Sequence, residues 1–212
     1  MLNNYSPNML KTFEKCPKQY WYKYVRKISI PQKSSYFEKG KKIHALAHYY
    51  LRGDDISKLE LALSEQEKQL WGSLIENEYF NKTYLNSEYN LACKVEQNWV
   101  SGRLDALMRS DEDYFILDYK TGSIPKTPEF DPQTMIYLLC VDKFLKNYNS
   151  LKFVYIDLKN NENHITEFDD DKRVEYENRV SRICKTLENF NFDLEFEHCK
   201  KCDFCEYNKI CI

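Results

Sequence analysis

The most informative stretch of this chain is Ile116-Leu117-Asp118-Tyr119-Lys120-Thr121-Gly122-Ser123. It continues an apolar run that begins at Tyr114 and stops at a Thr-Gly break, which is typical of a buried β-strand followed by a loop. Residues two apart in a strand share a face, so Asp118 and Lys120 are predicted to point the same way at the strand end. A carboxylate beside an ammonium in that place can hold a metal ion and position a water molecule.

A second acid lies in the preceding strand-like stretch, Gly102-Arg103-Leu104-Asp105-Ala106-Leu107, and the turn Ser110-Asp111-Glu112-Asp113 joins the two stretches. Leu104 and Leu107 do not share one parity, so this strand is expected to be partly buried on both sides. A buried carboxylate needs a partner, and a divalent cation supplies one. The alternative is that Asp118 and Lys120 form a surface ion pair and that Asp105 is a capping or hairpin residue.

Length and composition set the class of protein. The chain has 212 residues and a mass of 25.6 kDa, which predicts one domain spanning 1–212. Its apolar content is 42% and its mean hydropathy is −0.70, and it contains neither a membrane-length apolar run nor a signal-peptide core. We therefore expect a cytoplasmic protein without a membrane partner. In a reducing compartment, its eight cysteines are not expected to form a disulfide framework.

Basic residues are concentrated near the N-terminus. Residues 1–45 contain ten Lys and Arg against Glu14 and Glu38, a charge of +8, so the remainder must carry −10 to give the net charge of −2. Aromatic residues alternate with these charges, and cations with flat rings suit a single-stranded nucleic acid. A solvated helix face with its rings in the core remains the alternative. The candidate nucleic-acid-binding residues are Lys18, Tyr20, Trp21, Lys23, Arg26, Lys41 and Arg103.

The remaining patterns predict helices that flank a small mixed sheet, an α/β or α+β core. Ser6-Pro7 is an N-cap followed by proline, which predicts a helix from this point to about residue 15. Further helices are predicted at 18–25, 35–51, 63–80, 130–145 and 170–191, and strands at 90–97, 99–108, 113–119, 151–158 and 164–168.

Taken together, these motifs resemble the RecB-like branch of the PD-(D/E)XK nuclease superfamily. The branch also carries a histidine on an earlier helix, matched by Gly40-Lys41-Lys42-Ile43-His44, and a Gln-x-x-x-Tyr helix, matched by Gln133 to Tyr137. Leu104 stands where the superfamily's name places proline. The resemblance implies a restriction-endonuclease-like core at 35–192. It implies metal ligation by His44, Asp105, Asp118 and the Tyr119 carbonyl, and catalytic or supporting roles for Lys120, Asp118, Asp105, Gln133, Tyr137 and Glu96.

The cysteines of the tail, residues 193–212, have the spacing C-x₂-C-x₅-C, with Cys199 just upstream. Zinc and iron–sulfur clusters both accept such a set, and the spacing alone does not separate them. The resemblance implies a 4Fe–4S cluster, with Cys199 left over, that joins the basic helical segment 1–34 to the tail. Its ligands are Cys16, Cys202, Cys205 and Cys211. Cys93, Cys140 and Cys184 lie in apolar surroundings and are predicted to be core residues.

The resemblance therefore implies a nuclease that uses Mg²⁺ or Mn²⁺ to cleave DNA, most simply an exonuclease acting on single-stranded ends. Its biological setting would be recombination, repair or CRISPR spacer acquisition, with CRISPR-adaptation, helicase or recombination proteins as partners. Two alternatives come from other classes of protein. One is a non-catalytic DNA-binding or scaffold subunit with the same fold, and the other is a zinc-stabilised nucleic-acid-binding module.

Overall fold

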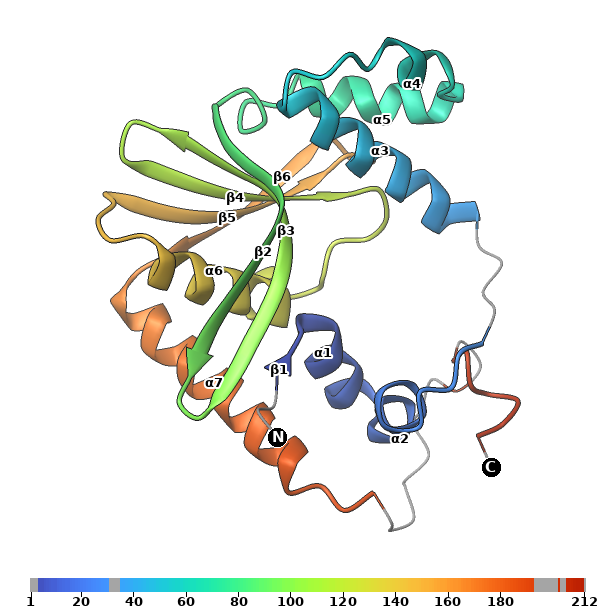
Figure 1. The fold of residues 1–212 in the computed structure, drawn as a ribbon, viewed down its shortest axis with the longest axis vertical. Helices are drawn as coiled ribbons and strands as arrows, with labels where there is room; N and C mark the ends of the chain where they lie inside the picture. Colours follow the sequence, from blue (N-terminus) through green and yellow to red (C-terminus); the bar gives the residue numbers. More distant parts are fainter. Residues whose placement is uncertain (1–3, 31–34, 193–201, 203–204, 212) are drawn as a thin grey trace.

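The structure is a computed structural model that describes residues 4–30, 35–192, 202 and 205–211. Its helices and strands alternate along the chain and form one mixed sheet with helices on both faces (Figure 1). The helices are α1 (Pro7–Lys15), α2 (Pro17–Tyr20) with a π-helical continuation (Trp21–Val25), α3 (Ser35–Leu51), α4 (Ser57–Leu61), α5 (Glu65–Ile75), α6 (Pro132–Phe144) after a 3₁₀ turn (Pro128–Phe130), and α7 (Asp170–Glu188).

The sheet contains β1 (Asn4–Tyr5), β2 (Thr83–Val95), β3 (Asn98–Ser110), β4 (Asp113–Lys120), β5 (Ser150–Asp157) and β6 (Glu162–Phe168). Strands β2, β3 and β4 form an antiparallel meander, β4 and β5 are parallel, and β5 and β6 are antiparallel. Because β4 and β5 run in the same direction, the chain must cross over between them, and α6 makes this crossover. The expected small mixed sheet flanked by helices is confirmed.

Two hydrophobic clusters hold the layers together, one on each face of the sheet. Helices α3 and α5 pack on one face through Ile43, Leu46 and Trp71. Helices α1, α6 and α7 pack on the other face, where α6 is buried along most of its length. Strand β3 contributes Leu104 and Leu107 to the second face but Ala106 and Met108 to the first, so it is buried on both sides there, as the sequence predicted.

Strands β3 and β4 separate at a defined point. Their pairing runs from Ser110 opposite Asp113 to Ala106 opposite Leu117 and then ends. Farther along the same edge of β3, β1 pairs with Trp99 and Val100. Between β1 and β4, this edge of β3 has no partner strand in the described parts of the chain. Asp105 lies in that gap, and Asp118 lies on the arm of β4 that diverges from it.

Most predicted elements are found within a few residues of their expected positions, with two clear differences. The helix expected at 63–80 is shorter, because α5 ends at Ile75 and the Asn77 side chain then accepts a hydrogen bond from the Tyr79 amide at 3.0 Å, which favours a turn. Strand β2 is longer than the expected 90–97 and begins at Thr83. None of the described helices is long and apolar enough to cross a lipid bilayer.

The N-terminal segment contacts the described part of the tail, 205–211, as Figure 1 shows beside α2. The Tyr22 hydroxyl donates to the Ile210 carbonyl at 3.0 Å, and the Tyr207 hydroxyl donates to the Ile28 carbonyl at 2.8 Å. The rings of Tyr22 and Tyr207 also stack, with centroids 5.3 Å apart. Two segments at opposite ends of the sequence therefore pack as one unit. Cys199 lies outside the described residues.

Candidate active site

The two acids predicted from the sequence face the gap between β3 and β4. Continuing the register of the hairpin past Ala106 and Leu117 would place Asp105 opposite Asp118. The backbone ladder is broken at that step, and the Tyr119 amide donates instead to Oδ2 of Asp105 at 2.9 Å. The separation of β3 and β4 therefore leaves space between the two strands at Asp105 and Asp118, while Asp118 stays paired with Tyr155 of β5 and a backbone hydrogen bond fixes the position of Asp105.

His44 reaches this gap from α3. Its Nδ1 lies 3.1 Å from Oδ1 of Asp105, and its Nε2 lies 3.0 Å from the carbonyl oxygen of Tyr119. Both neighbours are acceptors, so the ring satisfies them only when both nitrogens carry protons. Burial disfavours the charged ring, but the adjacent Asp105 carboxylate outweighs this and raises the pKa of His44 to about 9. The Asp105 carboxylate and the Tyr119 carbonyl therefore form a place that favours positive charge.

Asp118 is held on the other side of the gap by Lys120 and Gln133. The Lys120 ammonium lies 2.6 Å from Oδ2 of Asp118 and donates to Oε1 of Gln133 at 3.3 Å. The side-chain amide of Gln133, through Nε2, donates to the other oxygen of Asp118, Oδ1. Oδ2 of Asp118 is buried against the Lys120 ammonium, although the two atoms do not have good hydrogen-bonding geometry.

The electrostatics of this pair follow from its burial. Asp118 is only 2% exposed, and burial, followed by the charge of Asp105, raises its pKa to about 6. Burial opposes protonation of Lys120, but the Asp118 carboxylate outweighs it and the pKa of Lys120 is raised. A buried pair of acids of this kind is stabilised by cations, and His44 and Lys120 provide one for each.

Tyr137, one turn after Gln133 on α6, packs against the unpaired edge of β3 next to the gap. Its hydroxyl donates to the Arg103 carbonyl at 2.7 Å, on the unpaired edge of β3. Its ring lies directly over Gly102, where an added Cβ would be 2.2 Å from Cε1. Helix α6 begins at Pro132 because Asp131 caps it: the Asp131 carboxylate accepts a hydrogen bond from the backbone amide of Gln133 at 2.9 Å. Gln133 and Tyr137 thus both contact residues of the site.

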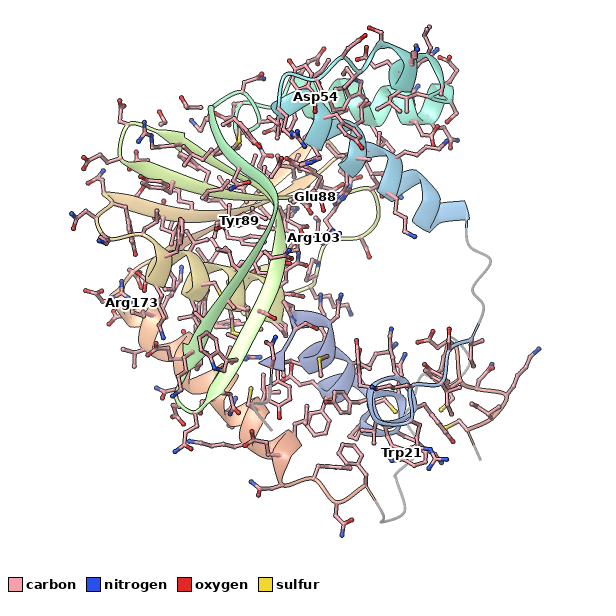
Figure 2. The ribbon with its side chains drawn as sticks, viewed as in Figure 1. Trp21, Asp54, Glu88, Tyr89, Arg103 and Arg173 are labelled. Atoms are coloured by element: carbon pink, nitrogen blue, oxygen red, sulfur yellow. The ribbon has the colours of Figure 1, made fainter. Side chains whose placement is uncertain are left out.

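The structure corrects the expectation for Glu96. This residue lies in the turn between β2 and β3, and its carboxylate pairs with Lys185 of α7 at 2.6 Å. Glu88 takes its place near the histidine, since ligand atoms of His44, Glu88 and Asp105 all lie within 4.8 Å of one another. Figure 2 shows Glu88 beside Arg103, with which it pairs at 2.8 Å. Oxygen donors with one imidazole at this spacing fit a divalent metal ion.

Sequence reasoning missed Glu88 because this residue precedes the strand expected at 90–97, in the irregular first half of β2. The register between β2 and β3 shifts between Tyr84 and Asn86, and Glu88 itself has a φ of 50°. A bulge re-aims side chains and is frequent next to functional sites. Nothing in the alternation of residues 83–90 signals such a shift.

A pocket of about 640 Å³ opens over the gap on the α3 side of the sheet. Three of its lining residues, His44, Glu88 and Asp105, are the metal-ligand group. The others come from α3, from β3 and from the loop after β4: Gly40, Lys41, Ala45, His48, Tyr49, Arg103 and Thr121. The candidate site is thus an accessible pocket and not a closed structural ion pair.

Of the N-terminal residues expected to bind nucleic acid, one is buried, and Trp21, Lys23 and Arg26 are at least partly exposed. Tyr20 is 5% exposed and packs edge-on against Phe13, so its ring belongs to the core and is unavailable for stacking, which corrects our expectation for it. Trp21 is partly exposed, and the Arg26 guanidinium lies 5.2 Å from its ring centroid (Trp21 is labelled in Figure 2). Lys23 lies 3.6 Å from Glu206 of the tail.

The cysteines divide into two groups. Cys93, Cys140 and Cys184 are buried in the core, as predicted. Cys16 is buried at the start of α2, whereas Cys202, Cys205 and Cys211 are partly exposed in the tail. Among the described residues, the group of His44, Glu88 and Asp105 is the only one with three metal-ligand atoms within 4.8 Å, so the cysteines are not gathered that closely.

Comparisons with known proteins identify the family of this chain. The family model of the PD-(D/E)XK nuclease superfamily matches residues 4–212, so the chain belongs to that superfamily. A search among curated proteins finds no match. Among solved structures, it is similar to a candidate exonuclease from Eubacterium rectale, with a TM-score of 0.60, 12% identity, and coverage of 96% of this chain and 87% of that one. It also matches SSO0001 at 18% identity and a TM-score of 0.48, over 100% of this chain and 86% of that one.

Family membership and sheet architecture together confirm the restriction-endonuclease-like fold. The identity to the solved structures is low, so that comparison supports the fold alone. The superfamily is one of nucleases that use divalent metals, and the donor set of His44, Glu88 and Asp105 fits such an ion.

Proposed function

We propose that this protein is a Mg²⁺- or Mn²⁺-dependent deoxyribonuclease that acts as an exonuclease on single-stranded DNA ends. The observation that carries the proposal is the convergence of Asp105, His44 and Glu88 in one pocket, where β3 and β4 diverge. Asp118 and Lys120, which pair with each other, are not among the residues that line the pocket, but Asp118 is near enough to Asp105 and His44 to interact with both electrostatically. Membership of the nuclease superfamily supports the same function.

Each side chain has a role that its contacts support. His44, Glu88, Asp105, Asp118 and the Tyr119 carbonyl would hold the divalent cation, which supplies electrophilic assistance to phosphodiester hydrolysis. Lys120, kept protonated by Asp118, orients the scissile phosphate and the attacking water. Gln133 fixes the amine and the carboxylate relative to each other, since it contacts both. Tyr137 holds the edge of β3 through the Arg103 carbonyl.

The decisive experiment compares two lysines. Lys120 and Lys152 are each paired with a carboxylate, at 2.6 and 2.7 Å, and their side chains are 26% and 29% exposed. Only Lys120 adjoins the gap. With end-labelled DNA and Mn²⁺, Lys120→Ala is expected to lower the cleavage rate by about 10²-fold or more, the effect of losing one preorganised electrostatic group. Lys152→Ala should cleave at the parent rate, and EDTA should stop both. Equal rates in the two variants would contradict the assignment.

The preference for single-stranded ends rests on the size of the pocket. A volume of about 640 Å³ has room for a few groups of one strand beside the metal-ligand group. Linear single strands should therefore be degraded, while circular single strands and flush duplexes persist. Rapid cleavage of the circles would identify an endonuclease instead.

For the tail, the proposal is a 4Fe–4S cluster held by Cys16, Cys202, Cys205 and Cys211. Its support is the packing of the tail on the N-terminal segment, through the hydrogen bonds of Tyr22 and Tyr207. Bridging the two ends of the chain would remove much freedom from the unfolded state, an effect worth several kcal/mol by analogy with a long disulfide loop, about 5 kcal/mol. The cluster is thus expected to fix the basic helices beside the core.

Metal analysis after oxygen-free purification tests the cluster. We expect iron with acid-labile sulfide and a visible absorbance, both lost in Cys16→Ala. Cys184→Ala is the control, because Cys184 is buried on α7 and its thiol, whose pKa burial raises to about 12, is a core residue. One equivalent of zinc and no iron would favour the zinc-stabilised module.

The biological role proposed is end trimming in recombination, repair or CRISPR spacer acquisition, alongside helicase, recombination or CRISPR-adaptation proteins, in the cytoplasm. The support for this role is the resemblance of the sequence motifs to the RecB-like branch of the superfamily. A duplex with single-stranded overhangs tests it. Shortening of the overhang to the duplex boundary is expected, and indifference to overhangs would argue against trimming.

A further inference from the structure

One face of α3 lines the pocket beyond the metal-ligand group. Lys41, His44, Ala45, His48 and Tyr49 lie at intervals of three and four residues, so they form a single stripe along the helix. Ile43, Leu46 and Ala47 occupy the opposite, buried face. The core therefore does not explain the composition of the lining stripe, which is basic and aromatic.

The far end of this stripe carries an exposed ring. Tyr49 is 42% exposed although it lines a pocket, and its only described ring partner is His48, with centroids 5.6 Å apart. His48 is fixed in turn, because its Nδ1 lies 2.7 Å from the Ser87 hydroxyl, which also contacts the Tyr84 hydroxyl at 3.1 Å. A hydrogen-bonded imidazole thus contacts a tyrosine ring that is partly exposed.

Two cations flank the pocket. The Arg103 side chain is 63% exposed and pairs with Glu88, and Lys41 is exposed at the opposite end of the stripe. Tyr49 follows His44 by five residues, which is about 7.5 Å along the helix axis. Both residues line the same pocket, so the pocket offers a place for the phosphate of one nucleotide at the metal-ligand group and for its base at the tyrosine.

We propose that Tyr49, supported by His48, is a base-stacking subsite for one unpaired nucleotide of the DNA strand whose phosphate is cleaved, with Lys41 and Arg103 neutralising adjacent phosphates. This inference rests on the proposed nuclease function and specifies its substrate as a strand with an unpaired base at the site. Aromatic stacking tolerates any base, so the subsite selects for single-strandedness and not for sequence.

A double-mutant cycle of binding affinities, which combines a substitution at Tyr49 with removal of one base from the DNA, tests the subsite independently of cleavage. The protein carries Lys120→Ala so that DNA stays intact, and fluorescence anisotropy in Mg²⁺ reports affinity for short labelled single strands. Tyr49→Ala is expected to bind about tenfold more weakly, and Tyr49→Phe like the parent, because the ring is what stacks. The measurement is repeated with a series of DNA strands that each lack the base at one different position. At one position, the missing base should abolish the difference in affinity between the parent protein and Tyr49→Ala.

Tyr50→Ala is the matched control. Tyr50 is 44% exposed, close to the 42% of Tyr49, but its ring packs against Trp71 and Phe80, away from the pocket lining. Melting curves verify that both variants are folded. Unchanged affinity in Tyr49→Ala, or an additive loss at every abasic position, would overturn the subsite even if the enzyme cleaves DNA. If the parent protein fails to cleave but the cycle shows coupling, the subsite stands and the catalytic proposal fails.

Discussion

Replacing Gly102 by alanine should test how tightly the unpaired edge of β3 is packed against α6. The new Cβ would lie 2.2 Å from Cε1 of Tyr137, with further ring atoms at 3.1 and 3.2 Å. Real carbon contacts require about 3.5 Å or more. Since Tyr137 is only 6% exposed, its ring must move within a packed core, or β3 must move away from α6.

The expected loss can be estimated from three effects. Overpacking of a buried site costs about 1–3 kcal/mol. Displacing the ring also weakens the hydrogen bond from Tyr137 to the Arg103 carbonyl, worth about 1 kcal/mol. Alanine recovers about 0.5–1 kcal/mol of backbone entropy relative to glycine in a strand. A net loss of about 2 kcal/mol in unfolding free energy follows, equivalent to about 4–8 °C in Tm for a chain of this size.

Urea and thermal unfolding measure this loss, and two variants give it a mechanism. Gly72→Ala is the control, because no heavy atom lies within 4 Å of a Cβ at that helical position, and it should stabilise the protein slightly. Gly102→Ala combined with Tyr137→Leu should lose less than the sum of the single changes, since the smaller side chain vacates the contested space. Wild-type stability in Gly102→Ala, or strict additivity, would refute the reasoning.

Three further predictions concern a buried acid, a helix cap and a pocket cation. Hydrogen bonds, first of all from the Ser64 amide, lower the pKa of Glu67 to about 2, so the contribution of Glu67 to the unfolding free energy is present above pH 4.5 and is lost as the pH falls toward 2. In urea unfolding, Glu67→Gln should therefore cost about 2 kcal/mol at pH 7 and almost nothing near pH 2. A loss that does not depend on pH would contradict this. Asp131→Ala, which uncaps α6, should cost about 1 kcal/mol and slow cleavage by displacing Gln133, whereas Asp131→Asn should keep the cap; equal effects would contradict the capping role. Lys41→Ala should reduce the logarithmic salt slope of single-strand binding by about 0.7, whereas Lys42→Ala, whose ammonium pairs with Glu67 at 3.0 Å, should leave the slope unchanged.

Local patterns in the sequence predicted much of the fold. The N-cap is one example, since the Ser6 hydroxyl accepts from the Met9 amide at 3.3 Å where Ser6-Pro7 predicted a helix start. The hairpin that carries Asp105 and Asp118 is another, because the turn residues and strand lengths alone fix its register. Such features depend on a few neighbouring residues, so one sequence suffices to find them.

The features that the sequence did not reveal depend on distant partners. The two-residue strand β1 exists because it pairs with Trp99 and Val100, and no local pattern marks it. The first half of β2 was missed because Ser87 is the only buried residue between 83 and 90, so the burial signal of a strand is absent. Glu88 lies between Ser87 and Tyr89, which pair with Ala106 and Leu104 of β3, so its place beside Asp105 is a property of the paired strands and not of either one alone.

The site is balanced in charge before any metal ion binds. Asp105 pairs with His44 at 3.1 Å, Asp118 with Lys120 at 2.6 Å and Glu88 with Arg103 at 2.8 Å, so each acid has its own basic partner. Buried carboxylates without such partners would repel one another and destabilise the fold.

Charge balance predicts that metal removal stops the reaction without unfolding the protein. In EDTA, cleavage should cease while circular dichroism and a cooperative thermal transition are retained, and added Mg²⁺ should raise Tm only as mass action requires. Arg103→Ala removes the partner of Glu88, so its Tm should respond more strongly to Mg²⁺ than that of the parent. Loss of tertiary structure in the parent protein on chelation would show that the three ion pairs do not compensate the acids.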